Sequence, residues 1–172
     1  SPSHRSKKLH QSLHVHPATP VRRQKTPMWI HSPSEFEARC QSKGIDHERL
    51  DAQTLSLKRQ ERRVPKSVLV RWLKNGQVIQ VIAPLELVIP PGVRKEISLF
   101  LADLDNDLLL PGLEISQKTG HVRFRYCLLA EPNRAISEAT LVSAINSALD
   151  TAQRVRLLIT DTFHQAAGPY LA

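Results

Sequence analysis

Hydrophobic and polar positions alternate in two stretches of the C-terminal half of the chain, and this pattern predicts a β-hairpin. The stretches are residues 110–116 and 121–130, and a period of two is that of strands with one buried face. The segment at residues 117–120, which ends in glycine, is typical of a tight turn between them. From Ser137 onward the apolar positions repeat at the helical period, so we expect a long helix that covers the hairpin.

A second hairpin is predicted in the middle of the chain. Asn75-Gly76 separates the apolar segment 67–73 from the apolar segment 77–83. Asn-Gly is favoured in two-residue hairpin turns, because both central residues take positive φ there. We therefore expect two antiparallel strands joined at this turn.

The register of this central hairpin leaves apolar side chains on both faces of its strands. Trp72 falls opposite Ile79 on one face, and the other face combines Arg71 and Gln80 with apolar residues. Those apolar residues are Leu69, Leu73, Val78 and Ile82. A sheet with one solvated face should alternate more cleanly. Either helices cover both faces or one face contacts another chain, and we favour the second alternative.

Further elements flank the predicted hairpins. Ser32 is a candidate N-cap for a helix that Gly44 is positioned to end. Apolar residues at helical spacing predict a second helix within residues 91–107. The leucines after Gly44 fit either a short strand at 54–58 or a helical turn, and residues 85–89 fit a further short strand.

These elements predict an α+β fold, in which an antiparallel β-sheet is packed by amphipathic helices and carries an extended basic N-terminal tail. We divide the chain into a Pro- and His-rich tail at residues 1–31 and a single α+β domain at residues 32–172. The length of the chain suits one domain of ordinary size with an appendage.

The positive charge of the chain is concentrated in the tail. Residues 1–34 carry six basic side chains and no acidic one, whereas the other 138 residues carry 18 basic and 16 acidic side chains. The tail also has few large apolar residues, so it lacks the apolar surface that would offset the entropy of ordering it. We expect it to be flexible and disordered when free in solution, or to be held by a partner.

Several roles for the tail stay open. Arg22 and Arg23 could lie along phosphates, contact a protein neighbour or belong to an organellar targeting segment, and an extension without a specific role is a further alternative. Residues 1–27 also precede Met28, the only methionine, which is a candidate natural start. We favour protein binding over nucleic-acid binding, because no aromatic residue stands among the basic ones before Trp29 to stack on bases.

No pattern in the chain predicts a catalytic centre, a cofactor or a metal site. Cys40 and Cys127 lie far apart without metal or redox spacing, and we expect both thiols to be reduced. Asp103, Asp105 and Asp107 match the first positions of a calcium-binding loop, but the glycine required for its sharp turn is missing. We expect these acids to be solvated at a helix end.

The predicted compartment follows from the cysteines and the hydropathy. No apolar run reaches the 18 or so residues that a membrane span needs. We expect a cytoplasmic protein, with the chloroplast or another organelle interior as the alternative.

Three segments of the chain resemble the YbjN family, whose fold is similar to that of type III secretion chaperones. They are FLADLDNDLLLPGLEIS, KTGHVRFRYCLLAE and ISEATLVSAINSALDTA, all within residues 68–159. The resemblance implies an antiparallel sheet backed by helices, frequent pairing as a dimer, and a binding or chaperone-like role without established chemistry. It brings no site residues, because the family has no defined site motif, and the basic tail departs from the acidic character typical of secretion chaperones.

We therefore expect a non-enzymatic adaptor, chaperone-like protein or assembly subunit that binds a protein partner through its sheet and its basic arm, as a homodimer or in a larger assembly. Nucleic-acid binding through the tail, with Arg123 and Arg125, is the alternative function. Trp72 is a candidate interface anchor, but we favour a place in the core for it. The candidate partner-binding residues are Arg22, Arg23, Trp29, Arg71, Trp72, Arg123 and Arg125.

Overall fold

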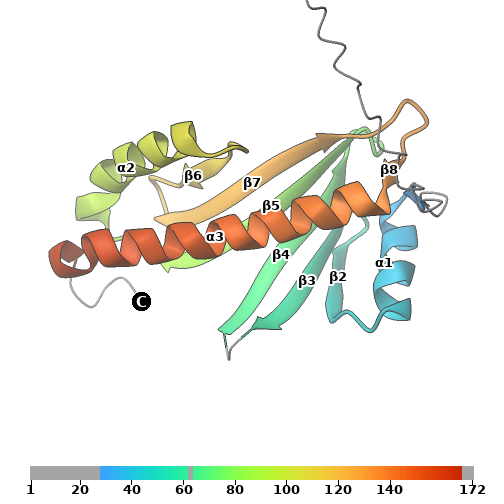
Figure 1. The fold of residues 1–172 in the computed structure, drawn as a ribbon, viewed down its shortest axis with the longest axis horizontal. Coiled ribbons are helices and arrows are strands. Elements are labelled where there is room, and N and C mark those ends of the chain that lie inside the picture. The colour runs from blue at the N-terminus through green and yellow to red at the C-terminus, as the bar shows by residue number, and fades with distance from the viewer. Residues whose placement is uncertain (1–27, 62–63, 168–172) are drawn as a thin grey trace, which may run out of the picture.

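A computed structural model describes residues 28–61 and 64–167 of the chain, and these residues form the predicted α+β fold. Within them, six antiparallel strands make one sheet, two short strands pair beside it, and three α-helices pack against the sheet or along its edges (Figure 1). The hydrophobic core lies between the sheet and the helices.

The elements follow one another in a simple order. They are β1 (Trp29–Ile30), α1 (Pro33–Ser42), β2 (His47–Asp51), β3 (Thr54–Glu61), β4 (Val64–Leu73), β5 (Val78–Val88), the 3-10 turn η1 (Pro91–Val93), α2 (Arg94–Asp107), β6 (Leu113–Ile115), β7 (His121–Leu129), β8 (Ile136–Ser137) and α3 (Glu138–Ala167). The sheet has the strand order β2-β3-β4-β5-β7-β6, and β1 pairs separately with β8. Strands β2 to β5 are therefore sequential neighbours, and the chain returns through α2 and β6 before β7 joins β5.

Helix α1 begins at the predicted cap. The hydroxyl of Ser32 accepts a hydrogen bond from the backbone N–H of Glu35 at 3.2 Å, which satisfies one of the free donors of the first turn. The Glu35 carboxylate accepts from the N–H of His31 at 2.8 Å, one residue before the position expected in a capping box. Past the end of the helix, Gly44 takes a φ of 66°, a conformation that favours glycine where a helix ends.

The central hairpin has the predicted register. Trp72 pairs with Ile79 across β4 and β5, and the turn residues Asn75 and Gly76 have φ values of 55° and 82°. The N–H of Gln77 closes the turn on the carbonyl of Lys74 at 3.2 Å. The local turn chemistry therefore sets which side chains share each face of these strands.

Residues 47–61 form a complete hairpin, β2 and β3, where the sequence left a choice between one short strand and a helical turn. Strand β3 pairs with β4 along its whole length, and this long-range pairing overrides the weak local pattern. Leu55 and Leu57 on β3 are buried in the core, and Thr54 and Ser56 face the other side of the sheet.

Residues 85–88 continue β5 instead of forming a separate strand. The register between β5 and β7 shifts between Pro84 and Val88, and Glu86 takes a φ of 57° within this irregular stretch. An arginine of α3 stabilises it, because Arg156 Nη1 donates to the carbonyl of Leu85 at 3.2 Å. Bulges of this kind let a strand bend without leaving its sheet.

Strand β6 is shorter than the predicted strand at residues 110–116. The N–H groups of Gly112 and Leu113 donate to Asp105 Oδ1 at 2.9 and 3.1 Å, so this backbone is tied to the end of α2. The acidic segment 103–107 is accordingly the last turn of α2 and not a loop. The sheet edge at β6 is held by a helix carboxylate that the strand pattern does not reveal.

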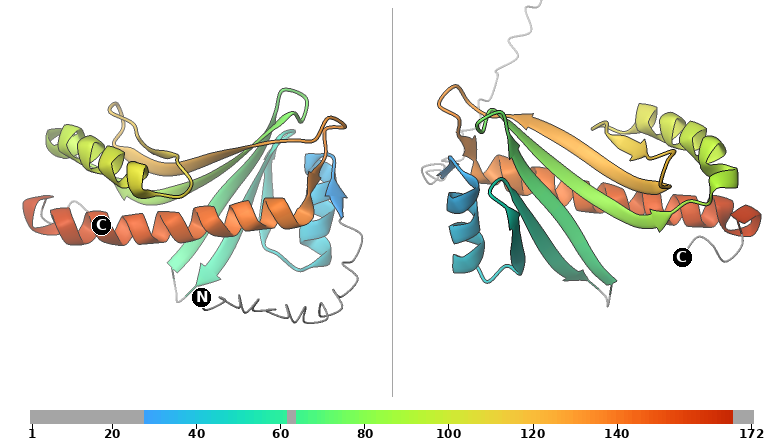
Figure 2. Two further views of the ribbon diagram at one scale, coloured as in Figure 1. Left: turned by 45° about the horizontal axis from the view of Figure 1, so that its top comes forward. Right: turned by 180° about the vertical axis from the view of Figure 1, so that it is seen from behind.

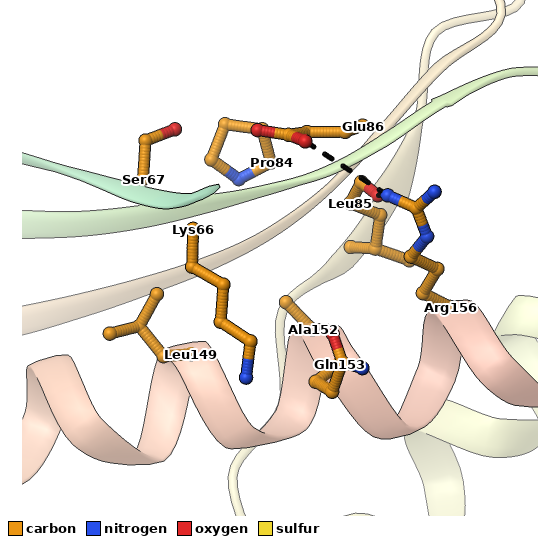
Figure 3. A pocket seen from close by; sticks show the side chains of 9 residues that line it. All are labelled: Lys66, Ser67, Pro84, Leu85, Glu86, Leu149, Ala152, Gln153 and Arg156. Carbon is orange, nitrogen blue, oxygen red and sulfur yellow. Dashed lines mark hydrogen bonds and ion pairs between the residues drawn. The ribbon is translucent and has the colours of Figure 1, made fainter. Parts of the chain in front are cut away.

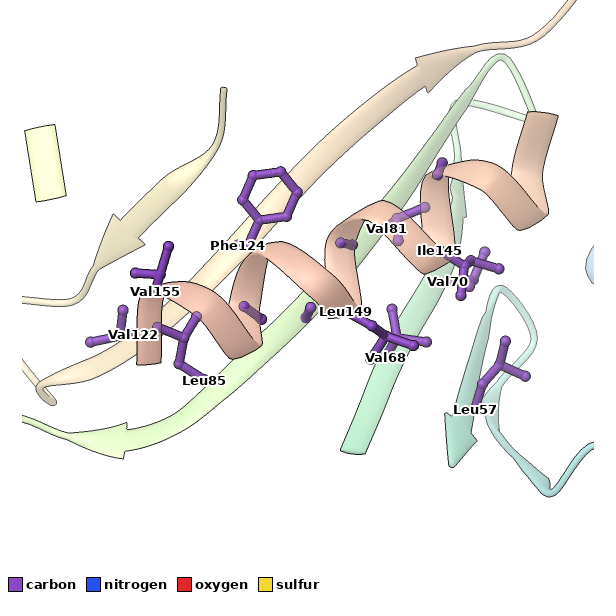
Figure 4. Packing of buried hydrophobic residues seen from close by; sticks show 14 of the residues in the cluster. Leu57, Val68, Val70, Val81, Leu85, Val122, Phe124, Ile145, Leu149 and Val155 are labelled. Carbon is purple, nitrogen blue, oxygen red and sulfur yellow. The ribbon is translucent and has the colours of Figure 1, made fainter. Parts of the chain in front are cut away.

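Helix α3 crosses the sheet and supplies much of the core (Figure 4). Its cap is the predicted one, because Ser137 Oγ accepts from the N–H of Thr140 at 3.1 Å. Its buried residues recur at helical spacing and are Leu141, Ala144, Ile145, Ala148, Leu149, Ala152, Val155, Ile159 and Phe163. Burying one large aliphatic side chain contributes about 1.5–3 kcal/mol, so this stripe stabilises the fold strongly. Among the described helices, none has the length and apolar content needed to cross a bilayer.

Candidate functional site

The helices leave one face of the six-stranded sheet uncovered in the described part of the chain. Residues of α1, α2 and α3 join one core cluster on the same side of the sheet. Seen from behind, β4, β5 and β7 lie in front of α3 with no helix over them (Figure 2). Helices therefore do not cover both faces within residues 28–61 and 64–167.

The cross-strand register sets the composition of this uncovered face, which consists of the outward side chains of β3, β4, β5 and β7. Leu69 pairs with Ile82, and Val78 pairs with both Leu73 and Leu129. Ile82 is only 5% exposed although no helix covers it, whereas Leu129 is 83% exposed. A contiguous apolar strip therefore runs over three neighbouring strands, and such strips mark contact surfaces more often than solvated ones.

Arg71 lies in the middle of the uncovered face. It pairs with Thr54 on one side and Gln80 on the other, and it is half-buried. Its Nε donates to Thr54 Oγ1 at 3.2 Å, and that hydroxyl is the one hydrogen-bond partner of Arg71 among the described residues. The N–H of Gln53, the Thr54 side chain and then the charge of Arg71 lower the pKa of Asp51. The guanidinium thus lacks a carboxylate in direct contact within this part of the chain.

Arg123 and Arg125 share one carboxylate of the same chain. Glu114 pairs across the strands with Arg123, as predicted, and its oxygens accept from Arg123 Nε at 2.8 Å and Arg125 Nε at 2.9 Å. Burial raises the pKa of Glu114, but the hydrogen bonds and charges of both arginines outweigh it and lower that pKa. An anionic partner at these arginines would have to compete with Glu114.

Of the two tryptophans, one is exposed and one is buried. Trp72 is 3% exposed and packs against Phe36, with ring centroids 5.8 Å apart, so it lies in the core, the interpretation that the sequence favours, and is not a surface anchor in this folded state. The reason is that α1 and α3 cover the face on which Trp72 lies. Trp29 is 41% exposed, but its strand neighbour Ile30 is 1% exposed.

The predicted tail therefore meets the folded body before residue 31. Trp29 and Ile30, placed in the tail by composition, form β1 and pair with β8. Arg22 and Arg23 lie outside the described residues.

Side chains with reactive or ligating chemistry lie apart. Cys40 is buried, and that burial raises the pKa of its thiol, which keeps it protonated and unreactive. Cys127 is exposed on the uncovered face. Within residues 28–61 and 64–167, no three His, Cys, Asp or Glu side chains gather as the ligands of a metal would.

A hollow on the surface of the described residues is too small for a ligand. It lies between α3 and the irregular end of β5, where Glu86 and Arg156 form an ion pair at 4.0 Å (Figure 3). Its volume of about 20 Å³ suffices for about one water molecule.

A larger groove lies on the covered side, between α1 and α3 and beside β3 and β4. Its volume is about 490 Å³, and its floor is apolar. The sequence analysis missed this groove, because its walls come from residues more than 100 positions apart, such as Phe36 and Leu149. The one sequence feature that points to the groove is the polar segment after residue 57. Its polar side chains end the apolar part of β3 beside the groove.

Comparisons of the chain with protein-family models, with curated proteins and with solved structures gave no match. The resemblance to the YbjN family therefore stays a prediction. The assignment of a function rests on the geometry of the chain itself, and above all on the uncovered face around Arg71.

Proposed function

We propose that the chain is a non-enzymatic protein-binding module, an adaptor or chaperone-like assembly subunit, that docks a protein partner on the uncovered face of its sheet. The observation that carries this proposal is the position of Arg71, a half-buried guanidinium without a direct carboxylate contact in the described chain, between Leu69 and Leu73. Arginine set in an apolar surround is typical of residues that dominate binding energy at interfaces.

The chemistry of this face defines the partner. An apolar ridge would lie on the strip of Leu73, Val78 and Leu129, and a carboxylate beside that ridge would form a two-pronged pair with Arg71. Forming this pair adds little to the desolvation free energy of Arg71, because its guanidinium is already half-buried before binding. A basic partner surface would be excluded by the same charge.

The size of the face bears on the role of the basic arm. Four strands about 4.8 Å apart, with 8 to 11 residues each, cover about 600 Å², whereas a stable interface buries about 800 Å² on each partner. The face alone would therefore bind weakly. In this proposal residues 1–27, with Arg22 and Arg23, supply the remaining contact as a tether.

The test uses a photo-crosslinker on Cys127, whose thiol is exposed on the proposed face while Cys40 is buried. Proteins captured from native lysate are identified by mass spectrometry for the wild type, for Arg71→Glu and for Lys95→Glu. Lys95 is exposed on α2, away from the face, so it matches the charge change. We expect one partner to be captured by the wild type and by the Lys95 variant, and to be lost with Arg71→Glu.

A second variant separates binding from folding. Leu129→Glu changes a side chain that is 83% exposed, so the fold should be retained and capture should again fail. Circular dichroism and a thermal melt check both variants. Equal capture of the same partner by the wild type, Arg71→Glu and Leu129→Glu would refute the proposal, and self-crosslinking of two copies would identify the partner as a second copy of the chain.

A further inference from the structure

The groove between α1 and α3 has the floor of a small-molecule site. Its apolar lining comes from α1, β3, β4 and α3, and consists of Phe36, Cys40, Leu57, Val68, Ile145 and Leu149. A volume of about 490 Å³ lies within the range of about 300–1,000 Å³ found for ligand pockets. The groove lies on the opposite side of the sheet from Arg71, so it is separate from the proposed protein-docking face.

The rim of the groove is richer in cations than in anions. Arg39, Lys43, Lys58 and Arg59 line it together with two carboxylates, those of Asp46 and Glu138, and Lys58 also pairs with Glu48 at 3.8 Å. One of these carboxylates is shared, because Glu138 accepts from Lys43 Nζ at 2.6 Å and from Arg39 Nη2 at 3.2 Å. Because one carboxylate is shared by two cationic side chains, a net positive charge remains at the mouth of the apolar groove.

Two competing occupants fit this groove poorly. Residues 1–27 of the same chain carry six basic side chains and no acidic one, so the cationic rim would repel them. Two turns of a partner helix, about 10 Å across and 11 Å long, would need about 850 Å³, so about two fifths of such a helix would lie outside a groove of about 490 Å³.

We propose that the groove binds a small amphiphile with an anionic head and a linear apolar tail, of the chemical class of long-chain carboxylates. The tail lies on the apolar floor between Phe36 and Leu149, and the head lies at Lys43, where it shares the cations that hold Glu138. An alkyl chain gains free energy with each buried methylene, while the charged head stays at the half-exposed rim.

Calorimetric titration of the full chain with sodium dodecanoate, below its micellar concentration, tests binding. We expect saturable binding of one molecule per chain, about tenfold tighter for tetradecanoate, since two more methylenes are buried. Dodecylammonium, which has the same tail and the opposite charge, should bind at least tenfold more weakly. Absence of saturable binding, or equal binding of both head groups, would overturn the proposal.

Variants locate the bound molecule. Lys43→Met keeps the aliphatic stem and removes the charge, and it should weaken dodecanoate binding at least fivefold, whereas Lys95→Met on α2 should leave it unchanged. Val142→Glu places a negative charge at an exposed lining position and should also weaken binding. Val142 is 37% exposed, so this variant stays informative even where loss of Lys43 disturbs α1. Unchanged binding in both groove variants would refute the site.

Cys127 provides an independent readout on the opposite side of the sheet from the groove. It is exposed on the uncovered face, whereas Cys40 at the groove is buried and does not report. Alkylation of Cys127 with iodoacetamide, followed by mass spectrometry, should proceed at the same rate with and without dodecanoate. Protection of Cys127 instead would place the amphiphile on the protein-docking face and contradict this proposal without bearing on the proposed function.

Discussion

At the residue scale, Glu114 shows how one carboxylate organises the closing hairpin. The sequence places it opposite Arg123, and the structure adds Arg125 from the next outward position of the same strand. A half-exposed network of this kind contributes less than a buried one, because water screens the charges. Its main effect is to fix the positions of two guanidinium groups and to make their pairing depend on pH.

We expect Glu114→Gln to lower the free energy of unfolding by about 0.5–1 kcal/mol at pH 7, after allowance for solvent screening. The pKa of Glu114 in the folded chain lies below its ordinary value of 4.5, so its contribution is present above that value and is lost as the pH falls through the folded pKa. Urea denaturation at pH 7 and pH 3.5 measures this.

The difference between the wild type and the Gln variant should shrink at the lower pH, since pH 3.5 lies below the ordinary value of 4.5 and ionising Glu114 on folding then costs free energy. Glu96→Gln, at an exposed position of α2, serves as the control. A difference that is the same at both pH values would show that the carboxylate charge is not the cause.

At the element scale, the short pair β1–β8 ties the start of the described chain to the N-terminus of α3. Ile30 is 1% exposed in the core, and the N–H of Glu138 donates to the carbonyl of Met28 at 2.8 Å. The same Glu138 then bridges Arg39 and Lys43 of the α1 segment. Burial raises the pKa of Glu138, but the Lys43 hydrogen bond, the largest influence, lowers it, and the net shift is downward.

Deleting residues 1–31 should therefore destabilise the domain relative to a deletion of residues 1–27. The longer deletion removes Ile30 from the core, and loss of a buried isoleucine costs about 2–5 kcal/mol. Urea denaturation of the two truncated chains, compared with each other, measures this difference. Equal stability would mean that β1 contributes nothing to the core, and Ile30→Ala in the full chain provides an independent check.

At the scale of the whole molecule, the described body is electrically balanced. Of the 24 basic residues, eight lie at positions 1–27 and 62–63, so residues 28–61 and 64–167 carry 16 basic and 16 acidic side chains. The formal charge of +8 therefore belongs to segments outside the described body. Nucleic-acid binding would have to rely on those segments, because phosphate affinity follows the number of basic contacts.

The full chain should accordingly bind a 20-base-pair DNA duplex only at the non-specific level, with a Kd of about 1–100 µM at physiological salt. Removal of residues 1–27 should abolish most of the salt-dependent part of the DNA-binding free energy, because six basic side chains are lost. Fluorescence anisotropy over a range of salt concentrations measures both effects. Nanomolar binding that survives the deletion would favour the nucleic-acid alternative over protein docking.

What the sequence determined by itself is local. The turn at Asn75-Gly76, the caps at Ser32 and Ser137, and the pairing of Glu114 with Arg123 all follow from neighbouring residues, and the structure confirms them. Each depends on φ preferences, hydrogen bonds within a few residues, or a period of two or 3.6, which operate along the chain.

Only the tertiary structure decided which face of the sheet the helices cover. Strands β4 and β5 carry apolar residues on both faces, so their pattern could not tell that α1 and α3 would bury Trp72 and leave Arg71 on the uncovered face. The groove beside Lys43 likewise forms where helices distant in the sequence pack against one sheet. The physical reason is that burial of a face depends on the free energy of packing the whole chain, which no single segment contains.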